Sequence, residues 1–143
     1  MNRINLICLG VKDLDQSLEF YKRIGFQTTA ERGAPIVFFN NSGSKLELYP
    51  IEKLALDIDE SNPPTIQQAG FSGITLACNM KSKEEVDALM EKVVRHGGTI
   101  VKQPQKVSWG GYSGYFQDLD GYYWEVAYGS DWKFDENDML IIE

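Results

Sequence analysis

The chain has 143 residues, of which 43% are hydrophobic and 12% aromatic, and its net charge is -7 with a pI near 4.7. This composition is typical of a globular protein, and the acidic balance argues against binding to the phosphate backbone of nucleic acids. No run has the apolar length of a membrane span or of a signal peptide, so we expect a cytoplasmic protein with no membrane partner. The two cysteines, Cys8 and Cys78, belong to no Cys/His cluster, which argues against a structural zinc site.

The first half of the chain, residues 1–50, predicts one module of strands around a helix. Alternating apolar residues predict a first strand, and apolar residues at helical spacing between Asp13 and Gly25 predict a helix. Three further strands are separated by turns rich in glycine and asparagine. The predicted strands of this module span residues 4–11, 26–31, 35–39 and 45–50.

Residues 51–70 differ from both flanking segments. They are acidic, contain Pro63 and Pro64, and show no clear apolar period. We therefore expect a linker between two halves of one structural domain.

The second half, residues 71–128, predicts the same order of elements. Ser82 is a candidate N-cap, and Glu84 and Glu85 favour the first turn of the helix that Gly97 and Gly98 end. The predicted strands of this module span residues 71–79, 99–102, 112–118 and 122–128. A tail of residues 129–143 follows.

A glutamate stands at the centre of a strand-like run in each half. These are Glu47, within residues 45–49, and Glu125, within residues 123–127. Residues 7–11 align with residues 74–78 at an offset of 67, and Glu47 aligns with Glu125 at an offset of 78. Internal repetition of this kind predicts an α+β fold of two βαβββ modules, whose curved, half-barrel mixed sheet surrounds a central cleft.

The order of elements and several motifs resemble the vicinal oxygen chelate superfamily, which includes glyoxalase I, extradiol dioxygenases, and fosfomycin and bleomycin resistance proteins. The resemblance covers about residues 4 to 128. Its most specific part is the Asp-Leu-Asp-Gly turn at residues 118–121, followed by the strand that carries Glu125. Residues 11–14 and the segment Leu46-Glu47-Leu48-Tyr49 add to it.

In the metal-dependent members of that superfamily, each of four strands supplies one ligand. The resemblance places these positions at Leu6, Glu47, Gly73 and Glu125, so both glutamates are present and both histidines are missing. The one histidine, His96, lies near the end of the second predicted helix. We therefore expect no cofactor, while a divalent metal held by the two glutamates stays the alternative.

Strand parity predicts what lines the cleft beside Glu47 and Glu125. Small residues share a face with each glutamate, and Lys45 has the parity to pair with Glu47, unless the two carboxylates share a proton. The cleft is either complete within one chain or assembled across a dimer. The candidate ligand-binding residues are Leu6, Cys8, Tyr49, Gly73, Thr75, Trp109, Tyr112 and Tyr123.

Two aromatic segments leave their roles open. Trp109, beside Gly110 and Gly111, forms either a mobile flap over a flat ligand or a turn whose ring packs on a neighbouring strand. The tail ends in the apolar residues 139–142, which need a place to be buried, either on the protein's own barrel or on a partner subunit. Burial on a partner subunit fits a homodimer, which we expect.

The first function that these features predict is binding of a small organic ligand without chemistry, as in the bleomycin resistance branch. Net negative charge suits a cationic or neutral ligand. The alternative is a glyoxalase-like lyase or isomerase, or another metal-dependent enzyme, with Glu47 and Glu125 as catalytic base or metal ligands. A third interpretation, a regulatory or partner-binding domain, rests on the acidic tail alone.

Overall fold

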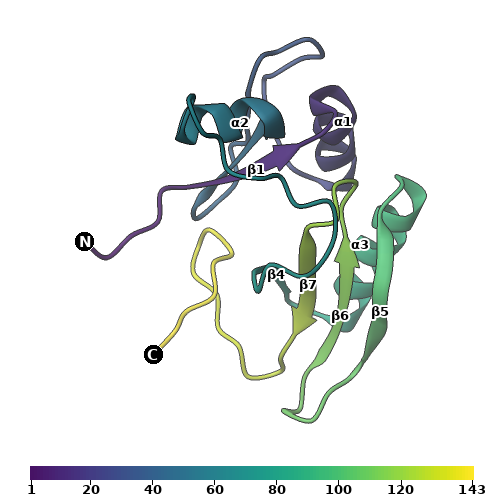
Figure 1. The fold of residues 1–143 in the computed structure, drawn as a ribbon. Helices are drawn as coiled ribbons and strands as arrows, with labels where there is room; N and C mark the ends of the chain where they lie inside the picture. The colour runs from purple at the N-terminus through teal and green to yellow at the C-terminus, as the bar shows by residue number, and fades with distance from the viewer. The chain divides into compact units, whose positions relative to one another are not determined.

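The structure is a computed structural model that describes all residues from 1 to 143. The chain forms two compact units, residues 1–70 and residues 71–143, and each is described by itself. Both units are mixed α+β, as the sequence predicts (Figure 1). None of their helices is long and apolar enough to cross a membrane.

The first unit contains a three-stranded sheet and two helices. In the sheet order β1-β3-β2, β3 runs parallel to β1 and antiparallel to β2. The elements in chain order are β1 (Leu6–Val11), α1 (Leu14–Ile24), β2 (Val37–Phe38), β3 (Lys45–Pro50) and α2 (Ile51–Ile58).

Helix α1 begins and ends where the sequence predicts. The Asp13 carboxylate accepts a hydrogen bond of 3.0 Å from the Gln16 backbone N–H, and Gly25 ends the helix with a φ of 124°. The core of this unit is made of fully or nearly fully buried apolar side chains from α1 and from the sheet. These are Leu9, Val11, Leu18, Phe20, Tyr21, Ile24, Val37, Phe39, Leu46 and Leu48. Burying each large apolar side chain contributes roughly 1.5–3 kcal/mol.

The strand predicted at residues 26–31 is absent, and β2 is shorter than the predicted 35–39. The Thr28 hydroxyl donates to the Phe38 carbonyl at 2.7 Å, so a side chain takes the acceptor that a neighbouring strand would use. One backbone bond, from Asn40 N to Gln27 O at 2.7 Å, joins the two segments. Gly33 then turns the chain with a φ of 87°. The first unit is therefore βαββα and not βαβββ.

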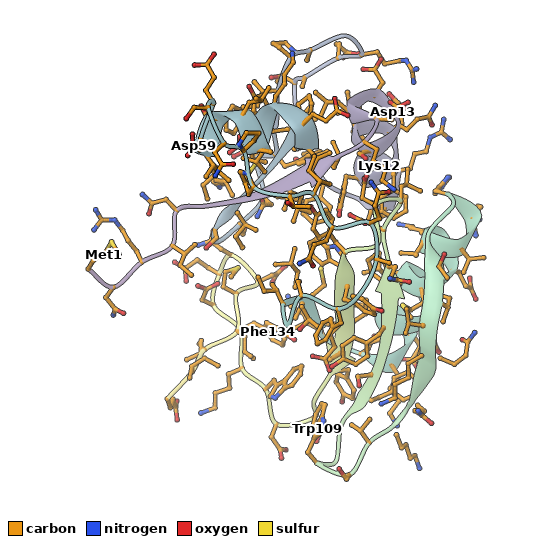
Figure 2. All side chains as sticks on the ribbon, viewed as in Figure 1. Met1, Lys12, Asp13, Asp59, Trp109 and Phe134 are labelled. Atoms are coloured by element: carbon orange, nitrogen blue, oxygen red, sulfur yellow. The ribbon has the colours of Figure 1, made fainter.

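The prediction that residues 51–70 form a linker is wrong for the first eight, which form α2. Ile51, Leu54, Ala55 and Ile58 recur at helical spacing, a period that the intervening acidic residues conceal. The helix ends before Asp59, whose carboxylate accepts from the backbone N–H groups of Ser61 and Asn62 (Figure 2). The residues from there to Gly70 form no helix or strand.

The second unit is a four-stranded sheet with one helix. In the order β4-β7-β6-β5, β4 and β7 are parallel and the other pairs antiparallel. Helix α3 lies against the sheet (Figure 1) and buries Val86, Met90 and Val93. The elements in chain order are β4 (Thr75–Met80), α3 (Lys83–Arg95), β5 (Thr99–Lys106), β6 (Tyr112–Gln117) and β7 (Tyr123–Tyr128).

Ser82 is the N-cap of α3 as predicted, and its hydroxyl accepts a 3.1 Å bond from the Glu85 N–H. Two strand boundaries differ from the prediction. Strand β4 begins at Thr75 and not at Phe71, because Gly73 has a φ of 85° and cannot continue a strand. Strand β5 runs to Lys106, beyond the predicted 99–102, because an edge strand with irregular register tolerates Pro104.

The tail folds back on itself within the second unit. Phe134 and Leu140 form a β-bridge, and Asp138 forms an ion pair with Lys81 at the end of β4. Met139, Ile141 and Ile142 nevertheless stay exposed. The homodimer expected from this apolar end remains a prediction.

Candidate functional site

Glu47 lies at the centre of the first sheet, between Cys8 of β1 and Phe38 of β2. Its side chain is buried, with 8% of the residue exposed. The Cys8 thiol donates a hydrogen bond to the Glu47 carboxylate. Burial, the negative charge of Glu47 and this hydrogen bond together raise the pKa of Cys8 to about 11. Cys8 is therefore a neutral thiol at physiological pH.

Helix α2 lies on the face of the sheet that carries Cys8. Gly10 has the same strand parity as Cys8, and a Cβ at Gly10 would stand 2.8 Å from Ile51 Cγ1. This close approach requires glycine at position 10. Residues of the opposite parity, Leu9 and Val11, are buried. The helix that the sequence analysis missed thus covers part of the face on which Glu47 and Cys8 meet.

A pocket of about 480 Å³ opens beside Glu47. Strands β1 and β3, helix α2 and the segment before β2 supply its walls. Its lining combines two carboxylates, a thiol and a phenol with three apolar side chains, and contains no basic residue. The lining residues are Cys8, Pro35, Ile36, Glu47, Tyr49, Leu54 and Asp57.

The predicted pairing of Lys45 with Glu47 does not form. The Lys45 ammonium group donates to the backbone carbonyl of Asn41, which the turn before β3 brings within reach. Glu47 takes part in none of the ion pairs of the structure. A neutral thiol, and not a cation, is thus the partner of this buried carboxylate.

Glu125 occupies the matching place in the second sheet, between Ala77 of β4 and Tyr115 of β6. The Tyr115 hydroxyl donates to the Glu125 carboxylate. Burial, followed by the negative charge of Glu125 and this hydrogen bond, raises the pKa of Tyr115 above its usual range.

Tyr115 is not among the site residues predicted from the sequence, although a signal for it exists. The hairpin between β6 and β7 is closed by a 3.1 Å bond from Asp118 N to Tyr122 O. Counting outward from that pair places residue 115 opposite residue 125. The turn and the strand alternation together were enough to find this residue.

Aromatic rings flank Glu125 along the same face of the second sheet. Tyr123 meets Phe71 edge to face, with ring centroids 5.2 Å apart. Beyond the other end of the β6–β7 hairpin, Trp109 stacks on Trp132 of the tail at 5.6 Å and 16° (Figure 2). Trp109 keeps 53% of its surface exposed. Trp109 therefore stacks on the tail and not on a neighbouring strand, and its role as a flap over a flat ligand stays a prediction.

The register changes the internal alignment of the two halves. Cys8 stands beside Glu47 as Ala77 stands beside Glu125, an offset of 69 (77 − 8) in place of 67. The counterpart of Leu6 is therefore Thr75, which pairs with Tyr123, and not Gly73. Gly73 precedes β4 and lies outside the sheet.

The structure divides the predicted ligand-binding residues into groups. Cys8 and Tyr49 line the pocket with Glu47. Leu6 lies on β1, the strand of Cys8, but is exposed and outside the pocket lining. Thr75 and Tyr123 share the Glu125 face of the second unit. Tyr112 lies on β6 three residues from Tyr115, so its side chain points to the opposite face of the second sheet.

Tyr112 is held on the helix side of the second sheet. Its hydroxyl donates to Asp87 of α3 at 2.8 Å, and its ring contacts the Lys83 ammonium group. This placement separates Tyr112 from the face on which Tyr115 meets Glu125.

A resident metal ion needs about three or four donor side chains close together. No group of three or more histidine, cysteine, aspartate or glutamate side chains is placed to hold one. His96 ends α3, where its N–H bonds to the carbonyls of Lys92 and Val93.

Comparison with known proteins gives consistent results. Residues 3–126 match the family described as Glyoxalase/Bleomycin resistance protein/Dioxygenase superfamily. A glyoxalase-related enzyme from Fulvimarina pelagi has 27% identity and a TM-score of 0.87, with 99% of each chain covered. A hypothetical protein from S. aureus has 25% identity and a TM-score of 0.74, covering 90% of this chain and 94% of its own.

A curated relative, the metallothiol transferase FosB of Shouchella clausii, is 27% identical over 131 residues, which are 91% of this chain and 82% of the relative. The family predicted from the turn at residues 118–121 and from the repeated modules is confirmed. The chain belongs to the glyoxalase/bleomycin resistance protein/dioxygenase superfamily.

Proposed function

We propose that this protein binds a small organic molecule in the pocket beside Glu47. The observation that carries the proposal is the pocket itself, about 480 Å³ with a mixed lining. Pockets of roughly 300–1,000 Å³ with apolar walls and a few polar groups are typical of small-molecule sites.

The lining suggests how such a ligand would be held. Ile36 and Leu54 offer apolar contact from two sides, and the Tyr49 ring adds an aromatic surface. The Glu47 carboxylate accepts one bond from Cys8 and keeps further acceptor positions, because an ionised carboxylate has about four. Those positions would orient a ligand that carries hydrogen-bond donors.

A pocket-filling variant tests the proposal in a thermal-shift screen of small organic compounds. Leu54→Trp places a large ring where Leu54 lines the pocket, and Leu56→Trp is the matched control on the same helix, because Leu56 is exposed and lines no part of it. We expect compounds that stabilise the wild type and Leu56→Trp to leave Leu54→Trp unshifted. Equal stabilisation of all three proteins would place the ligand elsewhere and contradict the proposal.

A second candidate is a glyoxalase-like lyase or isomerase in which Glu47 or Glu125 removes a proton from carbon next to a carbonyl. The observation that favours it is a buried carboxylate with a neutral partner at the wall of a pocket. The relative described as a metallothiol transferase adds thiol transfer as a reaction to assay.

Activity assays on Glu47→Gln and Glu125→Gln, with and without added divalent metal, separate the two candidates. An enzyme that uses these groups loses its activity in at least one variant, and full activity in both excludes them as bases. Elemental analysis of protein purified without chelator is expected to show no stoichiometric nickel, zinc, iron or manganese. One tightly held equivalent would overturn binding without chemistry.

A further inference from the structure

We infer that the pocket beside Glu47 selects a small organic cation, a molecule with an ammonium or amidinium group on an apolar body. This inference rests on the proposed function and adds the chemical class of the ligand. It comes from the charges of the lining and from how Glu47 is satisfied.

The lining of the pocket is negative at two depths. Glu47 on β3 is buried, and Asp57 on α2 is exposed, so one carboxylate lies inside and the other at the rim. No lysine, arginine or histidine belongs to the lining. A ligand cation would approach past Asp57 and end beside Glu47.

Glu47 lacks the partner that a buried carboxylate ordinarily has. Such groups are usually paired with a cation, because removing a charge from water is costly. The hydrogen-bonding partner here is the Cys8 thiol, which is neutral and a weak donor. The nearest basic side chain along its own strand, Lys45, is bonded to Asn41. A ligand ammonium group would supply the charge that the protein leaves out.

The rest of the lining requires the cation to be organic. Pro35, Ile36 and Leu54 are apolar, and a hydrated metal ion would gain nothing from contact with them. The Tyr49 ring adds a face that attracts cations. An anionic ligand of the same shape would be repelled by both carboxylates.

Three probes of one shape and different charge test the inference. These are 2-naphthylmethylamine, a cation at neutral pH, 2-naphthalenemethanol, which is neutral, and 2-naphthoate, an anion. Calorimetry should give the amine an affinity about tenfold higher than the alcohol, because hydrogen bonds to charged groups are stronger than neutral ones, and no detectable binding of the anion.

Variants assign that preference to the pocket. Glu47→Gln and, separately, Asp57→Asn should each reduce the preference for the amine. Glu52→Gln, which changes an exposed residue of α2 outside the lining, should keep it. Asp57 is exposed, so its variant tests the inference even if Glu47→Gln fails to fold.

The outcomes distinguish selection of a cation from the proposed function, which is binding of a small organic molecule in this pocket. Equal binding of the amine and the alcohol, tighter binding of the anion, or no binding of the amine overturns selection of a cation. In each case the proposed function survives if other compounds stabilise the wild type and not Leu54→Trp. If no compound stabilises the wild type more than Leu54→Trp, both the selection of a cation and the proposed function are overturned.

Discussion

The two glutamates occupy the same place in their sheets, yet their surroundings differ. Each stands beside a small residue of the parallel first strand of its unit, Cys8 for Glu47 and Ala77 for Glu125. Glu47 takes its hydrogen bond from that strand, whereas Glu125 takes one from Tyr115 on the opposite side. The repeated position fixes where the carboxylate stands, and the neighbouring strands determine what it meets.

What covers each glutamate face differs as well. Helix α2 lies over Gly10 in the first unit, and the pocket opens between this helix and the sheet. In the second unit, aromatic pairs flank the face, with the Trp109 and Trp132 rings closing against Gly111 and Gly129. The short helix α2 follows β3, and the aromatic tail follows β7. These two segments give the glutamates different surroundings although the sheets that carry them are alike.

The largest effect is expected from a substitution that pushes α2 away from the sheet of the first unit. Gly10→Ala should lower the free energy of unfolding by about 1–3 kcal/mol, because the new Cβ would stand 2.8 Å from Ile51 Cγ1 and force α2 outward. Urea unfolding measures it. Asn79→Ala is the matched control at the corresponding position of β4 and should change stability by less than about 0.5 kcal/mol. Unchanged stability of Gly10→Ala would mean that α2 does not rest on this face.

Thiol reactivity compares Cys8 with Cys78, which has no carboxylate beside it. Burial alone raises the pKa of Cys78 to about 11, and burial together with Glu47 does so for Cys8. Both thiols should react about tenfold more slowly with iodoacetamide than unfolded thiols, since fewer are ionised. Glu47→Gln should speed alkylation of Cys8 and leave Cys78 unchanged, as followed by peptide mass spectrometry. Equal acceleration at both would point to general loosening of the fold.

Tyr115→Phe tests the donor in the second unit. The change removes the hydroxyl that bonds to Glu125 and should cost about 1 kcal/mol of stability. Tyr123→Phe is the control on the same face, since its ring contact with Phe71 survives loss of the hydroxyl. Urea unfolding of both variants gives the comparison, and equal losses would show that the Tyr115 hydroxyl has no special role.

Local patterns predicted the elements that position the glutamates. The cap at Asp13, the cap at Ser82 and the alternation around Glu47 and Glu125 were sufficient for α1, α3, β3 and β7, because each depends on residues close in sequence. The resemblance at residues 118–121 led to the correct superfamily. Tyr115 could have been found from the hairpin that this turn closes.

Other features depend on contacts that a single sequence does not display. Helix α2 is short and acidic, and its apolar side chains gain from burial only once Gly10 admits Ile51. The pairing of Cys8 with Glu47 depends on the register of two strands that are distant in sequence and parallel, which no turn fixes. Gly73 fits a strand by alternation, and only its positive φ removes it.

A change in alkaline stability is expected when the first unit is made to match the second. The pKa of Cys8 is raised from the usual 9.0 to about 11. The stability that the protonated thiol contributes is therefore complete below pH 9.0 and is lost as the pH rises toward 11. The cause is that the unfolded thiol ionises first. Cys8→Ala copies Ala77 and should remove this loss, so the variant should gain on the wild type between these values in urea unfolding. A constant difference across that range would mean that Glu47 and burial do not hold Cys8 protonated.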